Sequence, residues 1–462
     1  MKVVVCLRRG LDGELGAFDA AAYEAALQIP DGEVTLLSMG PAQTEDYLRH
    51  LTRLGAKKAV LLCDAAFAGS DTLATAYILA AAIQKLSPDL VLCGRQTLVG
   101  DTGQVGPMLS AFLDMPLITQ VTSLQIAGRA LDCTTLEQGV QQAASPAVVT
   151  VERNFILRKP SIRSRMGEVA VWSGKDLDID LARCGLQGSP TRVQKTFENT
   201  TGKRKCRFIS LEELPVVLQD SLQKPRQEIT QPAETAKDLK KVCIVGESPL
   251  AFAQSVSDDI TVLPLSSEEK LMESIQSLAP NAVLFGSNPV SKALAARVSA
   301  RLGLGLCADC TALEAEGDSL VMYRPALSGS ILARIVSRTK PAMATVRTTG
   351  KSDNVVLTAG WGAKNNIGIL EQYAKLIGAQ LAASRKMVDS GLLPYHLQVG
   401  LTGKTVNPPV YIAVGVSGAV HHIAGMQQSG TVIAINPDKD ASIFEYANYG
   451  ILCDAEELKK LL

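Results

Sequence analysis

The chain has no excess of charge of either sign. Its 462 residues include 46 lysines and arginines and 46 aspartates and glutamates. Proteins that bind DNA, RNA or an anionic membrane through their charge carry a positive surplus, often gathered on one face. The balance therefore argues against nucleic acid as a partner.

Long hydrophobic runs are also missing. The N-terminal run Val3–Leu7 holds five apolar residues before Arg8 and Arg9. That is too short for the apolar region of a signal peptide, and a membrane helix needs about 20 such residues. We interpret this run as a buried strand, and we expect a cytoplasmic protein without a membrane span.

The cysteines and histidines do not form the patterns of a disulfide framework or a metal site. The ten cysteines are scattered, mostly in apolar runs such as Val60–Cys63, which is typical of buried, reduced thiols. One C-x-x-C pair, Cys307 and Cys310, has no histidine near it in sequence, and we interpret both residues as structural. The adjacent His421 and His422 lack flanking acidic or cysteine ligands, so we expect no metal.

The composition is that of a globular protein, with 47% hydrophobic and 20% charged residues. The length suggests roughly three domains. Over the first 120 residues, short β-branched runs alternate with stretches of helical periodicity. This alternation predicts a parallel, doubly wound sheet. Strands are expected at Val3–Leu7, Val34–Met39, Ala59–Cys63 and Leu90–Cys93, with helices at Asp19–Gln28, Thr44–Leu54 and Asp71–Leu86.

An internal repeat indicates two copies of this α/β unit. Several segments recur in the same order: Pro88–Gly94 as Pro280–Gly286, Leu113–Leu117 as Leu302–Leu306, Thr122 and Leu124 as Thr311 and Leu313, and Pro146–Val151 as Pro341–Val346. We call the two sets the first copy and the second copy. Unrelated buried strands of similar composition are the alternative explanation.

Two further regions complete the predicted organisation. Residues 184–240 contain four prolines and the basic run Lys203–Lys205, so we expect a linker with a solvated basic face and a short helix near Leu211–Leu218. A third unit opens with a strand at Val355 and closes with another at Thr431–Asn436. The expected domains are 1–183, 241–350 and 351–462, giving two doubly wound, nucleotide-hydrolase-like units and a C-terminal α/β domain.

Glycine-rich turns mark the candidate sites. In the first copy, the turn Gly100–Gly106 lies between a strand and a helix, where free backbone N–H groups and the helix dipole suit a phosphate. A purely structural turn remains an alternative. The carboxylate of Asp101 would repel phosphate, so we expect it to accept backbone N–H bonds and leave the amides of Thr102 to Val105 to the anion. The second copy lacks these glycines and is expected to have lost its ligand.

The third unit has glycine-rich turns at 359–363, 400–404 and 415–418. Three such turns in 60 residues suit a cofactor with a pyrophosphate.

At these residues the sequence resembles the electron-transfer flavoprotein family, with the beta and alpha subunits fused in one chain. The N-terminal half is similar to the beta subunit, and the C-terminal part to the alpha subunit. The shared segments are Ser38–Gln43, Ala66–Thr72 and Gly94–Pro107 for beta, and Tyr323–Ala326, Met343–Arg347, Ala383–Arg385, Leu397–Lys404, Tyr411–Ala419 and His422–Met426 for alpha.

The resemblance implies an FAD site in the C-terminal domain. Ser384 and Arg385 would lie beside the isoalloxazine ring, Thr402 near its N5 atom and His422 near O2, where a guanidinium and a histidine stabilise negative charge on the reduced ring. The other residues expected at the site are Trp361, Gln398, Gly403, Ser417, Asn436 and Asp454. Two positions depart from the family pattern: Trp361 replaces an arginine, and Leu401 replaces a glutamine.

The resemblance also implies a second nucleotide in the N-terminal half, either AMP or, as in electron-bifurcating members that react with NADH, a second FAD. The sequence of the Gly100–Pro107 turn resembles that of the electron-bifurcating members more than that of the AMP-binding members, which favours FAD. The residues expected there are Cys6, Met39, Asp101, Thr102, Gly103, Gln104 and Val105. Ile162 is the expected anchor for a partner flavoprotein dehydrogenase or oxidoreductase.

The expected function is therefore that of an FAD-based electron carrier. Two alternatives stay open: a non-redox module that binds an adenine nucleotide, and a self-sufficient flavin oxidoreductase with its own substrate. Neither alternative accounts for Ser384, Arg385, Thr402 and His422 occurring together.

Overall fold

A computed structural model of the chain describes residues 1–10, 13–97, 100–198, 202–223, 237–326, 331–347, 354–400 and 403–462. The chain divides into two compact units. The first unit takes in 1–196, 234–327 and 333–348, and the second takes in 197–233, 328–332 and 349–462. Within the described residues, no helix has both the length and the apolar character needed to cross a membrane.

The first copy of the repeat forms a nine-stranded sheet in the order β7-β6-β5-β8-β4-β1-β2-β3-β9. The core strands are parallel and β5, β6 and β7 form antiparallel pairs. The strands are β1 (Lys2–Cys6), β2 (Glu33–Met39), β3 (Lys58–Leu62), β4 (Leu90–Gly94), β5 (Leu117–Ala127), β6 (Ala130–Thr135), β7 (Gly139–Ala144), β8 (Ala147–Val151) and β9 (Glu168–Trp172).

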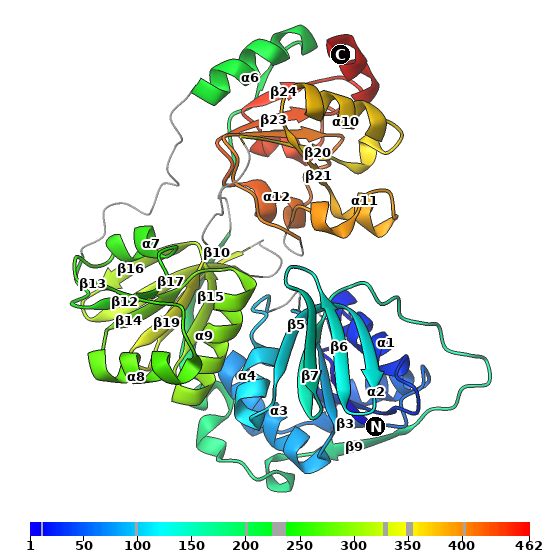
Figure 1. The fold of residues 1–462 in the computed structure, drawn as a ribbon, viewed down its shortest axis with the longest axis vertical. Coiled ribbons are helices and arrows are strands. Elements are labelled where there is room, and N and C mark those ends of the chain that lie inside the picture. The colour runs from blue at the N-terminus through cyan, green and yellow to red at the C-terminus, as the bar shows by residue number, and fades with distance from the viewer. Residues whose placement is uncertain are drawn as a thin grey trace. The chain divides into compact units, whose positions relative to one another are not determined.

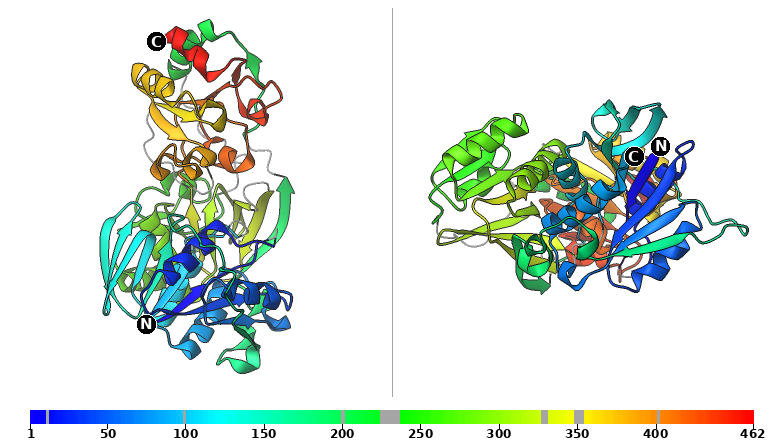
Figure 2. Two further views of the ribbon diagram at one scale, coloured as in Figure 1. Left: turned by 90° about the vertical axis from the view of Figure 1, so that its right-hand side faces the viewer. Right: turned by 90° about the horizontal axis from the view of Figure 1, so that it is seen from below.

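Helices cover both faces of this sheet, as the continuous apolar strands predict. Val3 and Val5 of β1 pack with α1 (Ala17–Leu27), whereas Val4 and Cys6 face α3 (Thr72–Leu86). Helix α2 (Thr44–Thr52) lies with α1, and α4 (Val105–Leu113) lies with α3 (Figure 1 and Figure 2). The predicted doubly wound sheet is confirmed.

The second copy repeats this order in a smaller parallel sheet, β13-β12-β14-β19-β15. Its strands correspond in order to β2, β1, β4, β8 and β5 of the first copy, which confirms the repeat. The strands are β12 (Val242–Val245), β13 (Ile260–Leu263), β14 (Ala282–Phe285), β15 (Leu306–Cys310) and β19 (Ala342–Val346), with helices α7 (Leu250–Gln254), α8 (Glu268–Leu278) and α9 (Pro289–Leu302).

The correspondence extends to a β-bulge. In the first copy Gln120 has a φ of 57° and its backbone N–H bonds to the hydroxyl of Thr150 at 3.1 Å. In the second copy Asp309 has a φ of 52° and bonds to Thr345 at 2.9 Å. Both bulges interrupt the pairing of the same strand of the repeat, β5 with β8 and β15 with β19.

The two copies pack through their helices inside the first unit. Met108 and Ala111 of α4 share a hydrophobic cluster with Ala295 and Val298 of α9. A further sheet has the strand order β10-β18-β17-β16, and three of its strands lie between β15 and β19 of the second copy in sequence. Its strands are β10 (Thr191–Glu198), β16 (Ala312–Glu316), β17 (Ser319–Ala326) and β18 (Ile331–Ser337); a short helix, α5 (Gly185–Gly188), precedes β10.

The second unit is a six-stranded parallel sheet in the order β11-β24-β23-β22-β20-β21. Helix α10 packs on one face and α12 on the other. The strands are β11 (Arg207–Phe208), β20 (Val355–Ala359), β21 (Gln380–Ala383), β22 (Val410–Val414), β23 (Thr431–Ile435) and β24 (Tyr449–Ile451), and the helices are α6 (Leu214–Gln223), α10 (Ile367–Leu376), α11 (Arg385–Asp389) and α12 (Val420–Met426).

The basic run predicted to be a solvated linker face is instead partly built into the second unit. The Arg204 guanidinium donates to the carbonyl oxygens of Gly430 at 2.6 Å and Ser429 at 2.5 Å, and to Oδ1 of Asn448. β11 follows directly and pairs with β24. The helix expected near Leu211 is present as α6 and the single turn before it.

Candidate functional sites

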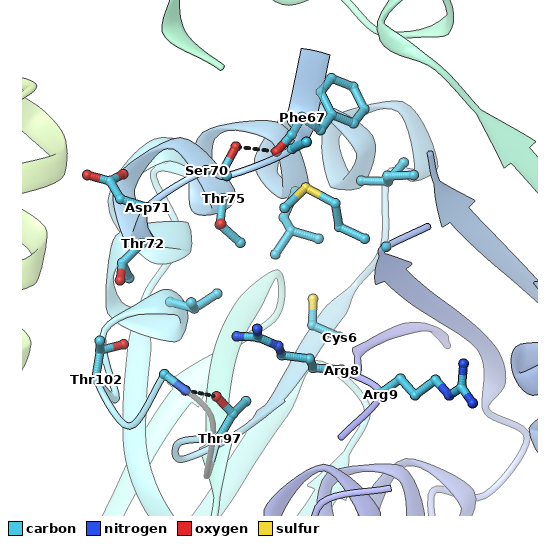
Figure 3. A pocket seen from close by; sticks show the side chains of 18 of the residues that line it. Cys6, Arg8, Arg9, Phe67, Ser70, Asp71, Thr72, Thr75, Thr97 and Thr102 are labelled. Carbon is cyan, nitrogen blue, oxygen red and sulfur yellow. Dashed lines mark hydrogen bonds between the residues drawn. The ribbon is translucent and has the colours of Figure 1, made fainter. Parts of the chain in front are cut away.

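The first unit contains a cavity of about 1240 Å³ at the carboxyl ends of β1, β2, β3 and β4. Open α/β sheets bind ligands at this edge, because loops diverge there and leave a crevice. Figure 3 shows Cys6 and Arg8 on one side of the cavity, with Ser70, Thr72 and Thr75 across from them. The segments 39–44 and 62–72 form much of the wall.

The glycine-rich turn leads into the cavity wall as predicted. Gly103 has a φ of 64°, and α4 begins at Val105. A Cβ atom on Gly106 would overlap the Thr150 side chain, so only glycine allows α4 to pack this closely on β8. The free N–H groups of this helix start are therefore held next to the cavity.

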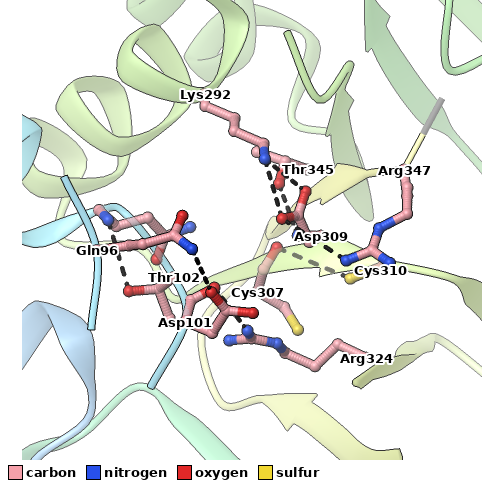
Figure 4. Close-up of polar contacts among 11 residues, drawn as sticks. Gln96, Asp101, Thr102, Lys292, Cys307, Asp309, Cys310, Arg324, Thr345 and Arg347 are labelled. Carbon is pink, nitrogen blue, oxygen red and sulfur yellow. Dashed lines mark hydrogen bonds and ion pairs between the residues drawn. The ribbon is translucent and has the colours of Figure 1, made fainter. Parts of the chain in front are cut away.

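The predicted role of the Asp101 carboxylate is wrong in one respect. It accepts a hydrogen bond from the side-chain amide of Gln96 at 2.8 Å instead of from backbone N–H groups (Figure 4). Burial raises the pKa of Asp101 to about 6, against the opposing effect of the Arg324 charge. A group with this pKa is still mostly ionised at neutral pH, so its charge opposes an anion there.

Arg324, on β17 of the second copy, reaches this turn. Its Nη2 atom donates to the backbone carbonyl of Asp101 at 3.0 Å. The residue is buried and lines the cavity, and its Nε atom has no hydrogen-bond partner among the described residues. A buried guanidinium with a free N–H suits an anionic ligand. Arg324 belongs to the Tyr323–Ala326 segment that resembles the alpha subunit, but the sequence did not predict that it lines the cavity.

Asp19 also lines the cavity, and it was not among the residues predicted from the sequence to do so. Its carboxylate accepts the backbone N–H of Arg8 at 2.9 Å and is buried. Burial raises its pKa to about 7, although the bond from Arg8 acts in the opposite direction. This group therefore titrates near neutral pH.

The structure brings four of the seven residues predicted for the second nucleotide to the cavity wall: Cys6, Met39, Thr102 and Val105. Asp101, Gly103 and Gln104 lie in the same turn but do not line the cavity. The side-chain amide of Gln104 is buried and has no hydrogen-bond partner among the described residues. Arg8 also lines the cavity. It follows the carboxyl end of β1, where parallel sheets bind ligands, so its position in the sequence could have predicted this.

In the second unit, the predicted FAD residues follow the carboxyl ends of parallel strands. Trp361 comes after β20, Ser384 after β21, Ser417 after β22, Asn436 after β23 and Asp454 after β24. Because these ends share one edge, the sheet gathers residues spread over 94 positions of sequence.

The backbone at this edge fits a closely approaching ligand. Cβ atoms on Gly360 and Gly415 would overlap each other's loops, so the two turns cross at a distance only glycine allows. The hydroxyl of Ser384 is buried and has no hydrogen-bond partner within the described part of the chain. An unsatisfied buried hydroxyl is costly unless a ligand meets it.

The charged group of this edge is Arg385, at the start of α11. Its Nε atom pairs with Asp389 at 3.1 Å, and its side chain is partly exposed. Burial lowers the pKa of the neighbouring His421, and the positive charge of Arg385 lowers it further. The guanidinium is thus the permanent cation of this group.

His422, the histidine expected near O2, is buried beside Tyr411. Its Nε2 atom lies 2.9 Å from the hydroxyl of Tyr411, and burial lowers its pKa to about 4. The ring is neutral at neutral pH. It can stabilise a negative ligand by hydrogen bonding but not by a full charge.

Trp361 stands where the family pattern has an arginine, and two cations accompany it. The ammonium groups of Lys364 and Lys386 lie 4.6 and 4.3 Å from the centre of its ring. Cation–π contacts therefore keep two positive charges next to Trp361.

The other predicted FAD residues have defined positions, with one exception. Gln398 is buried, and Gly403 packs against its carbonyl so closely that a Cβ atom would overlap it. Asn436 donates to the Val416 carbonyl at 2.9 Å, and Asp454 caps the last helical turns. Thr402 and Leu401 lie outside the described residues.

Ile162, the predicted docking residue, is fully exposed between β8 and β9. Within the described ranges, no group of three or more His, Cys, Asp or Glu side chains has the geometry to hold a metal ion.

Two protein-family models match the chain. The model of the electron transfer flavoprotein domain matches residues 3–177 and 258–352, and that of the electron transfer flavoprotein FAD-binding domain matches residues 351–427.

Curated proteins are similar to different parts of the chain. The electron transfer flavoprotein subunit beta of Thermoanaerobacterium thermosaccharolyticum is 40% identical over 207 residues, which cover 42% of this chain and 80% of that protein. Protein FixA of Azorhizobium caulinodans is 37% identical over 227 residues, 45% and 81% of the two chains. The subunit alpha of T. thermosaccharolyticum is 34% identical over 237 residues, 39% and 72%.

One polypeptide thus carries similarity to both subunits and matches the model of an FAD-binding domain. The chain therefore belongs to the electron transfer flavoprotein family, as a fused beta–alpha electron carrier with FAD as cofactor.

Proposed function

We propose that the chain passes electrons between a partner flavoprotein dehydrogenase or oxidoreductase and a downstream acceptor, and that it holds a second FAD in the cavity of the first unit. The observation that carries the second part is the cavity volume of about 1240 Å³. Small-molecule pockets are typically about 300–1,000 Å³. A dinucleotide such as FAD fills a cavity of this volume more completely than AMP does.

The groups at the cavity wall support a phosphate-bearing ligand. The start of α4 offers free N–H groups, and Arg324 offers a buried cation whose Nε atom has no partner in the described part of the chain. Both favour an anion in a setting where water competes little.

For the FAD of the C-terminal domain, we propose a binding set of ten residues. Bound FAD supplies the one-electron chemistry. Arg385 would provide the fixed positive charge, and neutral His422, oriented by Tyr411, would provide a hydrogen bond. The set is Trp361, Ser384, Arg385, Gln398, Thr402, Gly403, Ser417, His422, Asn436 and Asp454.

We further propose that Ile162 anchors the partner protein. A fully exposed isoleucine has no role in the core of this chain, and apolar anchors commonly carry an interface. Ile162→Ala should slow reduction by the partner while the FAD potential stays unchanged. A loss of bound FAD in this variant would contradict a docking role.

The second-nucleotide proposal is tested by denaturing the purified chain and quantifying what it releases. Two FAD per chain, with direct reduction by NADH, is the expected result. One FAD with one AMP, and reduction only through a partner dehydrogenase, would overturn the second FAD while keeping the nucleotide site. One FAD alone would leave the first unit as scaffold.

A further inference from the structure

The wall of the cavity in the first unit contains a pair of thiols that the electron-carrier function does not use. Cys307 lines the cavity with 3% of its surface exposed, and Cys310 lies behind it at 0%. The Cys310 thiol points at the Cys307 carbonyl, 3.8 Å away. The spacing is C-x-x-C, the pattern first noticed in the sequence.

The β-bulge at Asp309 places both thiols on one side of β15. In a regular strand, residues three apart face opposite sides of the sheet. Here Cys307 pairs with Ala344 and Cys310 with Val346, so three residue steps of β15 lie opposite two of β19. Two strand steps span about 6.6 Å, within the Cα separation that a disulfide tolerates. Both cysteines belong to the same hydrophobic cluster.

The bulge itself does not require cysteine. The first copy has the same bulge at Gln120, with the same register against β8, and carries Ile118 and Val121 at the matching positions. Apolar side chains therefore satisfy this geometry. Packing therefore does not explain why the second copy has cysteines at both positions.

The surroundings make the two thiols unequal. A hydrogen bond with Cys310 and the nearby charge of Arg324 lower the pKa of Cys307, against the opposing effects of burial and of the Asp309 carboxylate. Burial raises the pKa of Cys310. In Figure 4 the Cys307 side chain points toward Arg324. A guanidinium nearby, access through a cavity and a second thiol behind are the features of a reactive pair.

We propose that Cys307 and Cys310 form a redox-active dithiol that hydrogen peroxide oxidises to a disulfide through the cavity. The Cys307 thiolate attacks one peroxide oxygen, the O–O bond breaks, and the leaving oxygen takes a proton and departs as water. Cys310 then attacks the sulfenic sulfur of Cys307 and releases a second water. The two thiols lose two electrons and two protons, and one peroxide becomes two waters.

A second thiol pair in the same cavity serves as an internal control. Cys6 and Cys93 lie opposite each other on β1 and β4 and both line the cavity. The hydrogen bond with Cys6, burial and the charge of Asp19 all raise the pKa of Cys93. Cys307, Cys6 and Cys93 all line the cavity whereas Cys310 does not, so the comparison is between Cys307 and the two thiols of the second pair.

The test treats the full, reduced chain with graded hydrogen peroxide, blocks free thiols and maps all ten cysteines by mass spectrometry. We expect a Cys307–Cys310 disulfide, reversible by dithiothreitol, to form before any product at Cys6 or Cys93, because the thiolate is the reactive form and the pKa of Cys307 is lowered whereas that of Cys93 is raised. Cys243, buried in β12, should stay reduced.

Two variants test the order of the steps. In Cys310→Ala, a sulfenic acid should accumulate on Cys307 and be trapped by a 1,3-diketone reagent. In Cys307→Ala, Cys310 should remain a thiol. Oxidation spread evenly over the cysteines, a first product at Cys6 or Cys93, or no linkage between Cys307 and Cys310 in the unsubstituted chain would each overturn the proposal.

Discussion

The guanidinium of Arg324 holds the backbone carbonyl of Asp101 at 3.0 Å, across 223 positions of sequence. The arginine belongs to β17 on the side of the second copy, and the aspartate belongs to the glycine-rich turn of the first. One copy of the repeat thus positions the candidate phosphate turn of the other, and both parts of the fused chain contribute to a single cavity.

Replacing Arg324 should weaken the second nucleotide without affecting FAD in the C-terminal domain. A hydrogen bond from a charged group contributes about 1.5–3 kcal/mol, so Arg324→Gln should reduce affinity about 10- to 100-fold. The readout is the amount of each nucleotide retained after dialysis. Arg338→Gln is the matched control, because Arg338 also donates to a carbonyl, that of Gln187, but does not line the cavity.

Asp19 should make the first unit less stable as pH rises toward neutrality. Its folded pKa is raised from 3.8 to about 7, so the folded state binds more protons than the unfolded state between these values. Stability that is present below about pH 4 is lost as pH rises through about 7, by at most about 4 kcal/mol.

The measurement for Asp19 is the urea midpoint of the wild type and of Asp19→Asn at pH 5 and pH 8. Asparagine keeps an oxygen that can accept the Arg8 N–H and does not ionise. The wild type should lose stability between the two pH values relative to the variant. Parallel changes in both proteins would show that Asp19 does not titrate in this range.

Arg385→Ala should lower the reduction potential of the C-terminal FAD. A positive charge near the ring favours the reduced, negatively charged forms, and its loss should shift the potential by on the order of 50–100 mV. Arg385→Lys should retain most of the effect. Lys375→Ala, at the end of α10, is the control for a general loss of charge. A redox titration with an unchanged midpoint would remove Arg385 from this role.

Arg204→Ala should destabilise the second unit by about 3 kcal/mol. The substitution leaves the carbonyls of Ser429 and Gly430 without their charged donor, and unsatisfied buried acceptors are costly. The exposed neighbour Lys205 is the matched control, since Lys205→Ala should change stability by no more than about 0.5 kcal/mol. Thermal unfolding followed by circular dichroism gives both values; equal, small shifts would show that Arg204 is not an anchor.

Much of the architecture was predictable because it rests on local patterns. Continuous apolar strands such as Val3–Leu7 specify a sheet covered on both faces, and the repeated segments specify a second sheet with the same strand order. Glycine turns after strands identify the edges at which ligands bind. Family resemblance then identified residues such as Ser384 and Asn436, which the parallel strands of the second unit gather at one edge.

What the sequence by itself determined is therefore the set of elements, their repeat, and the family with its FAD. The tertiary structure alone decided which distant groups meet and in what state. It brought Arg324 to the turn at Asp101, and it buried His422 so that the pKa of the ring is lowered. It also built Arg204 into the second unit. The bulge in β15 placed Cys307 and Cys310 on the same side of that strand. The physical reason is that burial, charge proximity and a bulge depend on neighbours in space, whereas periodicity and turn composition depend only on neighbours in the chain.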